Sequence, residues 1–435
     1  MPKRITFTPR RVSHDPAPSV ERRIVFYVPG YDPDAERRYR ALFVRELRRY
    51  AKCFRIKTPS MTRPVTRDDG RSQTWTVEAE AGVARTRTTY EVLLWSDLVQ
   101  RDMARSYGVS ACLNAWALLH VAANGTLARL YRANWKCGNV ILYPFVMSLV
   151  LLAGVLGLGL LGHGLLHGSG LPFWIAVLLG VALGVGVFKA VAPRLDRAFL
   201  WQLMHDWIFH WQHARGRRPD YRQRIGEFAE HILTRIRQGD YDEILIVGHS
   251  TGGLTAVELA ARLLADDPRL GTGGPTFSLL TLGSSLPIVA LQPRGRTVRA
   301  AVECLMRSPR LVWVDYQAPQ DWLNFPGFNP VSDLALGIPE AETANPIIRS
   351  AKFSEIILAE TYRQIRFRPF RMHFQFLMAN DRAGVFDIFA LCLGDQCLRD
   401  RVLGENAAPL GSAVPGPSRG PDAAPRVAPP PCGTP

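Results

Sequence analysis

Residues 243–267 read EILIVGHSTGGLTAVELAARLLADD, and this stretch decides the fold of the chain. Its first five residues are apolar enough for a buried strand, and the small and aliphatic residues after Ser250 favour a helix. Only a sharp turn separates the two elements. A strand that turns directly into a helix is typical of α/β proteins, so the sequence predicts a mostly parallel sheet flanked by helices.

The turn carries the pattern G-x-S-x-G, formed by Gly248, Ser250 and Gly252. A turn this tight needs very small residues two positions before and two positions after its centre, and both are glycine here. The serine hydroxyl then stands above the sheet at a helix N-terminus, where the helix dipole favours a developing oxyanion. As a bare pattern the motif is common, but between a strand and a helix it predicts that Ser250 is a nucleophile.

A serine nucleophile needs a base and an acid, which in this architecture follow in the order serine, acid, histidine. His373 is the only histidine after Ser250 and is therefore the predicted base, the alternative being a histidine that is hydrogen-bonded in a loop. The segment VWVDYQAPQDWLNF offers two acids. Asp321 is favoured because it follows the A-P-Q turn. Asp315, still within the predicted strand, is the second choice.

An oxyanion hole requires two backbone N–H groups near the serine. Thr251, directly after the nucleophile, supplies the first. The loop VPGYDP after an early apolar run supplies the second, with Tyr31 as the expected donor and Gly30 allowing close backbone approach. The alternative for this loop is a plain turn with no catalytic role.

The segments FYVPGYDP, VGHSTGG, APQD and MHF follow one another in this order, and together they resemble the α/β-hydrolase superfamily of serine esterases and lipases. The resemblance covers residues 23–400 apart from an apolar hairpin. It implies a Ser-Asp-His triad, no cofactor, and ester, thioester or amide substrates. The chain departs from the family in two ways. P-G stands where many members have H-G, and the hairpin interrupts the domain upstream of the serine.

The apolar hairpin comprises residues 140–161 and 173–188, both without charge. The first run is long enough to cross a bilayer core of about 30 Å, and the second is long enough when flanking residues join it. The connecting GHGLLHGSG has no Lys or Arg, whereas both outer flanks are basic. The positive-inside rule therefore places both soluble segments and both termini in the cytoplasm, at the inner membrane. The alternative is a buried helical hairpin in a soluble protein. The turn histidines, His163 and His167, are interpreted as ordinary loop residues.

The composition excludes several classes of protein. The 435 residues carry a net charge of +15 and are 47% hydrophobic, which is too long and too apolar for a disordered chain or a disulfide-stapled miniprotein. The seven cysteines contain no CxxC, which argues against a metal site and favours a reducing compartment. Cys392 and Cys397 are predicted to be buried thiols. The arginines are spread along the chain without a nucleic-acid-binding motif, so no nucleic-acid partner is expected.

Further elements follow from periodicity and breakers. We expect helices from Asp34, over residues 221–238, and over 197–215, the last lying along the membrane. Strands are expected at residues 23–28, 54–59, around Tyr90, and at 277–285, 310–317 and 363–370. The predicted units are a basic arm (1–22), a first hydrolase segment (23–136), a transmembrane hairpin (137–195), a second hydrolase segment (196–403) and a disordered Pro/Ala-rich tail (404–435).

Two hypotheses of function result. The first is a membrane-anchored serine hydrolase that cleaves a carboxylic ester, with a lipid or acyl ester as substrate and the bilayer as partner. The second is a catalytically silent membrane scaffold or partner-binding protein with the same fold, suggested by the basic arm and the Pro-rich tail.

Overall fold

One sheet organises the chain. A computed structural model describes residues 5–13, 17–81, 84–196 and 199–411. In this part of the chain, nine strands form one sheet in the order β2-β4-β5-β1-β6-β7-β8-β9, with β3 paired to β4. The strands are β1 (Arg22–Val28), β2 (Ser60–Met61), β3 (Val65–Thr66), β4 (Ser72–Ala81), β5 (Ala84–Leu93), β6 (Glu243–His249), β7 (Thr276–Leu282), β8 (Val312–Gln317) and β9 (Ile347–Ser350).

The centre of the sheet is parallel and one edge is antiparallel. β1 lies between β5 and β6 and is parallel to both. β7, β8 and β9 continue the parallel order, whereas β2, β3 and β5 each pair antiparallel with β4. The α/β class with a mostly parallel sheet flanked by helices is confirmed. The antiparallel strand β4 occupies a stretch for which the sequence pattern predicted no strand.

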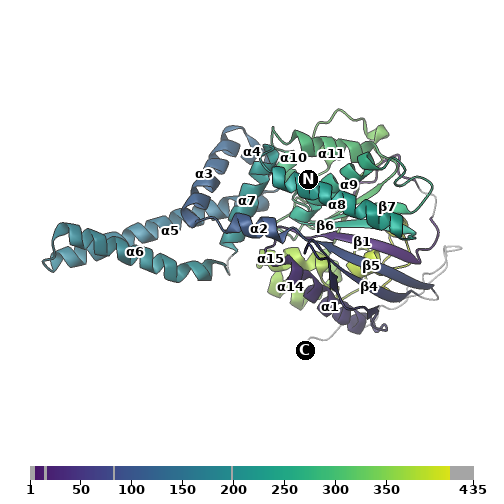
Figure 1. Ribbon diagram of the computed structural model, residues 1–435, viewed down its shortest axis with the longest axis horizontal. Helices are drawn as coiled ribbons and strands as arrows, with labels where there is room; N and C mark the ends of the chain where they lie inside the picture. The colour runs from purple at the N-terminus through teal and green to yellow at the C-terminus, as the bar shows by residue number, and fades with distance from the viewer. Residues whose placement is uncertain (1–4, 14–16, 82–83, 197–198, 412–435) are drawn as a thin grey trace.

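Helices cover both faces of the sheet, because successive side chains of its strands point to opposite sides. Ile24 and Phe26 of β1 join one core, and Val25 and Tyr27 join the other. Figure 1 shows α8, α9 and α11 on one face and α1 on the other. The first core takes α2 (Ser96–Met103), α3 (Tyr107–Ala123), α4 (Thr126–Ala133), α7 (Leu200–Ala214), α8 (Pro219–Gln238), α9 (Thr251–Asp266), α10 (Leu286–Ala290) and α11 (Arg296–Arg307). The second takes α1 (Ala35–Phe54), α13 (Phe353–Ile356), α14 (Ala359–Ile365), α15 (Pro369–His373), α16 (Ile388–Leu393) and α17 (Leu398–Leu403).

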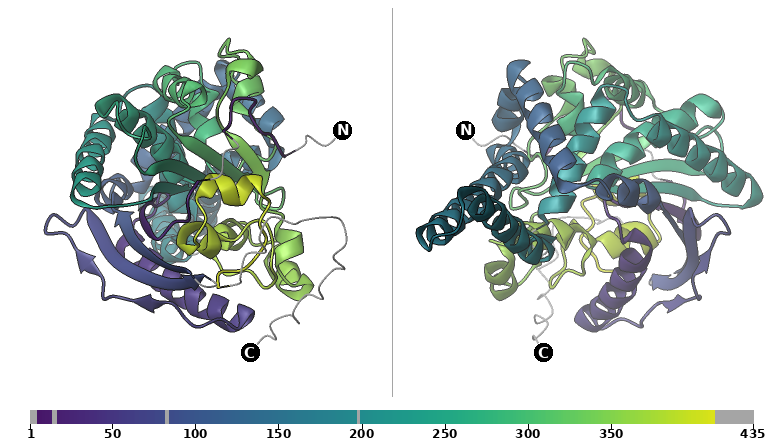
Figure 2. Two further views of the ribbon diagram at one scale, coloured as in Figure 1. Left: turned by 90° about the vertical axis from the view of Figure 1, so that its right-hand side faces the viewer. Right: turned by 60° about the vertical axis from the view of Figure 1, so that its left-hand side comes forward.

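The apolar hairpin forms two long helices, α5 (Trp135–Gly168) and α6 (Phe173–Asp196), which project from the α/β body (Figures 1 and 2). Both are long and apolar enough to cross a membrane, and only 6% and 17% of their most apolar stretches are buried. In this structure the two helices are therefore not buried against the α/β body. The chain turns only after Gly168, where Gly170 has φ +93°, so the expected loop histidines His163 and His167 lie in α5 and stack on each other.

Residues 197–215 were predicted to form a helix along the membrane. The helix is present as α7, but its predicted location is wrong. α7 is packed in the first core, with Trp207, Phe209 and Trp211 buried. Its histidines are buried as well, and each has a polar partner from another element. His205 contacts Ser110, His210 contacts Ser285 and His213 contacts Glu258, all at 2.9 Å.

Two predicted strands are also wrong. Residues 54–59 hold the end of α1 and a loop, because α1 continues to Phe54 and ends at Arg55 in a left-handed conformation. Residues 363–370 hold the end of α14 and the start of α15, and the last strand is β9. Cys392 and Cys397 are buried as predicted, and burial raises the pKa of each thiol to about 12. Residues 412–435 of the predicted tail and residues 1–4 and 14–16 of the predicted arm lie outside the described residues.

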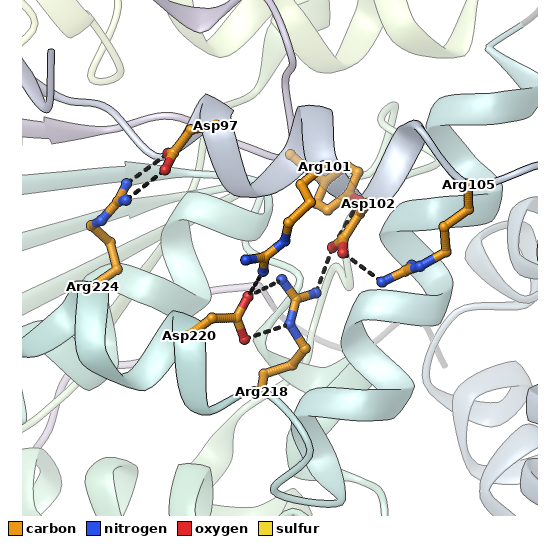
Figure 3. A network of polar contacts seen from close by, with 8 residues as sticks. Asp97, Arg101, Asp102, Arg105, Arg218, Asp220 and Arg224 are labelled. Carbon is orange, nitrogen blue, oxygen red and sulfur yellow. Dashed lines mark hydrogen bonds and ion pairs between the residues drawn. The ribbon is translucent and has the colours of Figure 1, made fainter.

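A network of ion pairs joins α2 to the start of α8 (Figure 3). Arg224 holds Asp97 through two hydrogen bonds of 2.8 and 2.7 Å. Arg218 lies 2.5 Å from Asp102, and both side chains are buried. Asp102 also accepts a hydrogen bond of 3.3 Å from the hydroxyl of Tyr31. The network therefore reaches the loop after β1.

Removal of one partner of this buried pair should destabilise the protein strongly, because an unpaired charge would remain in the interior. We expect Arg218→Met to lower the free energy of unfolding by about 3–5 kcal/mol, measured by denaturant titration in detergent. Arg217→Met, at the exposed neighbouring position, is the matched control and should change stability little. Equal losses for the two variants would show that the pair does not stabilise the fold.

Candidate active site

Ser250 lies at the turn between β6 and α9 and is the N-cap of α9. Its backbone adopts φ 59° and ψ −125°, which is rare for a residue with a side chain. Such a conformation costs of order 1–3 kcal/mol and persists only where the surroundings hold it. Here the Ser250 N–H donates to the carbonyl of Leu282, and its carbonyl accepts from the N–H groups of Gly253 and Ser285.

The two glycines of the motif are required by close backbone contacts. A Cβ on Gly248 would lie 2.3 Å from the carbonyl oxygen of Gly252. A Cβ on Gly252 would lie 2.1 Å from the carbonyl oxygen of Val28, at the end of β1. Both positions therefore require glycine, as the motif predicted. The second contact also brings the end of β1 against the serine turn.

His373 and Asp321 are paired in the structure. His373 Nδ1 donates to Asp321 Oδ2 at 2.6 Å, and both side chains are buried. Asp321 lies in the loop after β8, where Leu323 N–H and Asn324 Nδ2 also donate to its carboxylate. Three donors therefore fix the position of this carboxylate.

Asp315 is engaged elsewhere. It lies within β8, and its carboxylate accepts hydrogen bonds from Thr281 Oγ1 and Gln317 Nε2. The structure thus brings Asp321, the first choice for the acid, to His373, and leaves Asp315 with partners of its own.

His249 packs against the histidine of this pair. The two rings lie 4.4 Å apart, and His249 Nε2 lies 3.2 Å from the backbone carbonyl of His373. Burial and the neighbouring His373 lower the pKa of His249 well below its usual value. A neutral His249 can donate to that carbonyl and so fix the backbone that carries His373.

The loop after β1 meets the serine as expected. A Cβ on Gly30 would stand 3.2 Å from the Ser250 Cβ, so the Gly30 backbone is in contact with the serine. The neighbouring Tyr31 is buried, its hydroxyl donates to Asp102, and its carbonyl accepts from Gln202 Nε2 at 2.6 Å.

A small cavity of about 40 Å³ connects these groups. Ser250, His373, Gly30 and Tyr31 all line it. His373 Nε2 is buried and has no hydrogen-bond partner among the described residues. The predicted nucleophile, the predicted base and the loop expected to supply the second oxyanion donor therefore share one cavity.

Asp206 on α7 lines the same cavity, and the sequence did not single it out. Its Oδ1 accepts a hydrogen bond of 2.9 Å from the Thr251 hydroxyl and lies 3.3 Å from His210 Nδ1. Burial raises the pKa of Asp206. Asp206 is the only acidic residue in the otherwise apolar, aromatic and histidine-rich sequence of α7, and that isolation was the available signal.

A second cavity, of about 960 Å³, adjoins the first. The two share four lining residues, Leu203, Leu323, Phe370 and Phe374. Within the described ranges, no group of three or more His, Cys, Asp or Glu side chains is placed to hold a metal ion.

Comparisons with known proteins gave no match: no family model fits the chain, and neither a curated protein nor a solved structure matches it. The geometry of the site is therefore the basis for any functional conclusion.

The buried carboxylate of Asp315 makes the stability of the fold depend on pH, whether or not the protein is an enzyme. Burial raises its pKa above the unfolded value, so the folded state keeps a proton that the unfolded state has lost. Its contribution to stability therefore falls as pH rises from about 4 through the raised pKa. We expect Asp315→Asn to gain stability relative to the wild type over this range, measured as the difference in Tm. Asp240→Asn, at an exposed carboxylate, is the control. A difference that does not vary with pH would contradict the prediction.

Proposed function

We propose that this protein is a membrane-anchored serine hydrolase that cleaves carboxylic esters of lipid or acyl type. Ser250 is the nucleophile, His373 the base and Asp321 the acid. The observation that carries the proposal is the 2.6 Å hydrogen bond between His373 and Asp321, with His373 and Ser250 lining the same cavity.

The chemistry follows from this arrangement. Ser250 Oγ attacks the carbonyl carbon of the ester while His373 Nε2 takes the serine proton. Asp321 holds the imidazole with its proton on Nδ1 and stabilises the positive charge that the ring gains. His373 then returns the proton to the leaving alcohol, which departs from the acyl-enzyme. Water, activated by His373, hydrolyses the acyl-enzyme to the free acid.

The tetrahedral intermediate carries a negative oxygen. The N–H groups of Thr251, at the first position of α9, and Tyr31 are the proposed donors. A charged carboxylate beside Thr251 would oppose this oxyanion. Burial raises the pKa of Asp206, which favours its neutral form and reduces that opposition.

We propose further that α5 and α6 span the membrane. Side chains such as Leu160 and Trp174 expose 71% and 74% of their surface to the surroundings. From residue 146 to its end, α5 has 23 residues that extend about 34 Å at 1.5 Å per residue, enough for a bilayer core. At the base of the hairpin, α3 adds exposed Trp116 and Leu119 on its surface. The charge pattern of the flanks supports a cytoplasmic active site.

Membership of the α/β-hydrolase superfamily belongs to the same proposal. It is supported by the parallel sheet, the serine turn after β6, and the neighbouring strand β1 whose loop contacts the serine. The alternative, a catalytically silent scaffold, drew on the basic arm and the tail. Most of the tail and part of the arm lie outside the described residues, and the described residues show no feature that favours the scaffold.

Labelling with a fluorophosphonate, which reacts with activated serines, tests the nucleophile directly. Membranes containing wild-type protein should be labelled, whereas Ser250→Ala and His373→Ala should not. All variants are compared at equal amounts of folded protein. A folded wild type that is not labelled would favour the scaffold.

The identity of the acid is tested by a matched pair of variants. Asp321→Asn should lower kcat for a short soluble ester by roughly 10³–10⁴-fold, because the imidazole loses the group that fixes its tautomer. Asp315→Asn, in which a buried carboxylate away from His373 is changed in the same way, should retain a rate close to that of the wild type. The reverse ranking would make Asp315 the acid.

A further inference from the structure

The 960 Å³ cavity beside the active site has mainly apolar walls. They include Leu42, Leu203, Trp322, Leu323, Phe370 and Met378. Its volume lies at the upper end of the range of about 300–1,000 Å³ for small-molecule sites. Because it shares four lining residues with the cavity at Ser250, a chain bound here leads to the nucleophile.

One wall of this cavity is the start of α5. Asn139, Val140 and Tyr143 line it, and a few residues further on the same helix becomes the exposed apolar segment. Phe199, which follows the second helix of the hairpin, stacks on Phe370 with 3.7 Å between the ring centroids. Both residues line the cavity. The cavity therefore lies where the hairpin leaves the α/β body, which is the level at which a spanning hairpin enters the bilayer.

Four arginines also line the cavity, and they come from two helices. Arg38 and Arg45 lie on α1, while Arg368 and Arg371 lie at α15. Arg38 pairs with Asp32 and Asp34, and Arg45 pairs with Glu46. Among the described residues, Arg368 and Arg371 form no ion pair.

The arginines at the opening of the cavity outnumber the carboxylates that pair with them. Burial and the neighbouring guanidinium groups of Arg45, Arg49 and Arg368 lower the pKa of Arg371, against the opposing effect of Glu46. Glu46 itself is shared between Arg45 and Arg49. An anionic group bound between Arg368 and Arg371 would relieve this repulsion and gain charge-assisted hydrogen bonds.

The segment next to these arginines fits a membrane surface. Phe367 exposes 74% of its surface, and the guanidinium of Arg366 lies 4.6 Å from its ring centroid. An exposed aromatic ring flanked by arginines suits the region of lipid headgroups, where the ring is buried and the charges meet phosphates.

We propose that the substrate is an anionic, phosphate-bearing lipid ester taken directly from the bilayer, with its acyl chain in the 960 Å³ cavity and its phosphate held by Arg368 and Arg371. This inference rests on the proposed hydrolase function. In the reaction the Ser250 Oγ–acyl bond forms as the bond between the acyl carbon and the lipid oxygen breaks. The lysolipid oxygen takes the proton from His373, and water then releases the fatty acid.

The test compares full-length protein on two lipids of identical acyl chains that differ only in the phosphate, phosphatidic acid and diacylglycerol, in vesicles of otherwise equal composition. We expect the wild type to release fatty acid from the anionic lipid at least tenfold faster. Arg368→Gln/Arg371→Gln should reduce this rate ratio toward one. A contribution of about fivefold per arginine corresponds to about 1 kcal/mol for each cationic side chain at an anionic surface. Arg363→Gln, on the neighbouring helix α14, is the matched control and should keep the wild-type ratio.

Three outcomes would overturn this proposal. They are equal wild-type rates on the two lipids, a rate ratio that the double variant leaves unchanged, and equally fast hydrolysis of a short-chain, water-soluble acyl glycerol phosphate. The last result would identify a soluble phosphate ester as the substrate. Failure of the hydrolase function itself looks different, because the wild type would then react with neither the fluorophosphonate nor any ester.

Discussion

The contact between Gly252 and the carbonyl of Val28 is the constraint on which the site depends. Because Gly252 has no Cβ, the start of α9 can lie directly against the end of β1, where any larger residue would clash. That approach places the loop carrying Gly30 and Tyr31 against Ser250. It also holds the serine in its strained conformation, since the turn has no room to relax. The proposed nucleophile and both proposed oxyanion donors are therefore positioned by backbone packing.

Buried charges fix the same region from two sides. At the far end of β1 and β6, Arg23 and Glu243 form an ion pair of 2.7 Å with no exposed surface. The remaining donors of Arg23 reach carbonyls of the segment before α17, and Glu243 also accepts from Ser278. At the other end of β1, Asp102 connects Tyr31 to Arg218. β1, whose following loop is the proposed source of the second oxyanion donor, is thus held at both ends by groups that cannot be left unpaired at low cost.

Local patterns predicted the parts of this fold that depend on short stretches of sequence. The strand, turn and helix around Ser250 could be predicted because glycine size and apolar runs are local properties. The order of serine, acid and histidine then left His373 as the only base, and the structure places Asp321 beside it. α7 could not be predicted in the same way. Its aromatic and histidine content resembles an interfacial helix, and it is buried only because Ser110, Ser285 and Glu258 arrive from distant elements to satisfy its histidines.

The arginine-lined cavity shows the same limit more clearly. Arg38 and Arg371 are more than 300 residues apart in the sequence, and each alone looks like one member of an evenly spread arginine population. They meet because α15 ends in His373, which pairs with Asp321, while α1 begins shortly after the loop of Gly30 and Tyr31 that contacts Ser250. Both helices must therefore lie at the mouth of the same site. Since α5 forms another wall and continues into the apolar hairpin, the proposed membrane anchor also shapes the proposed route of a lipid to Ser250. Under the proposed function, anchoring and substrate access are one structural feature, and this would account for the insertion of the hairpin between β5 and β6, upstream of the serine.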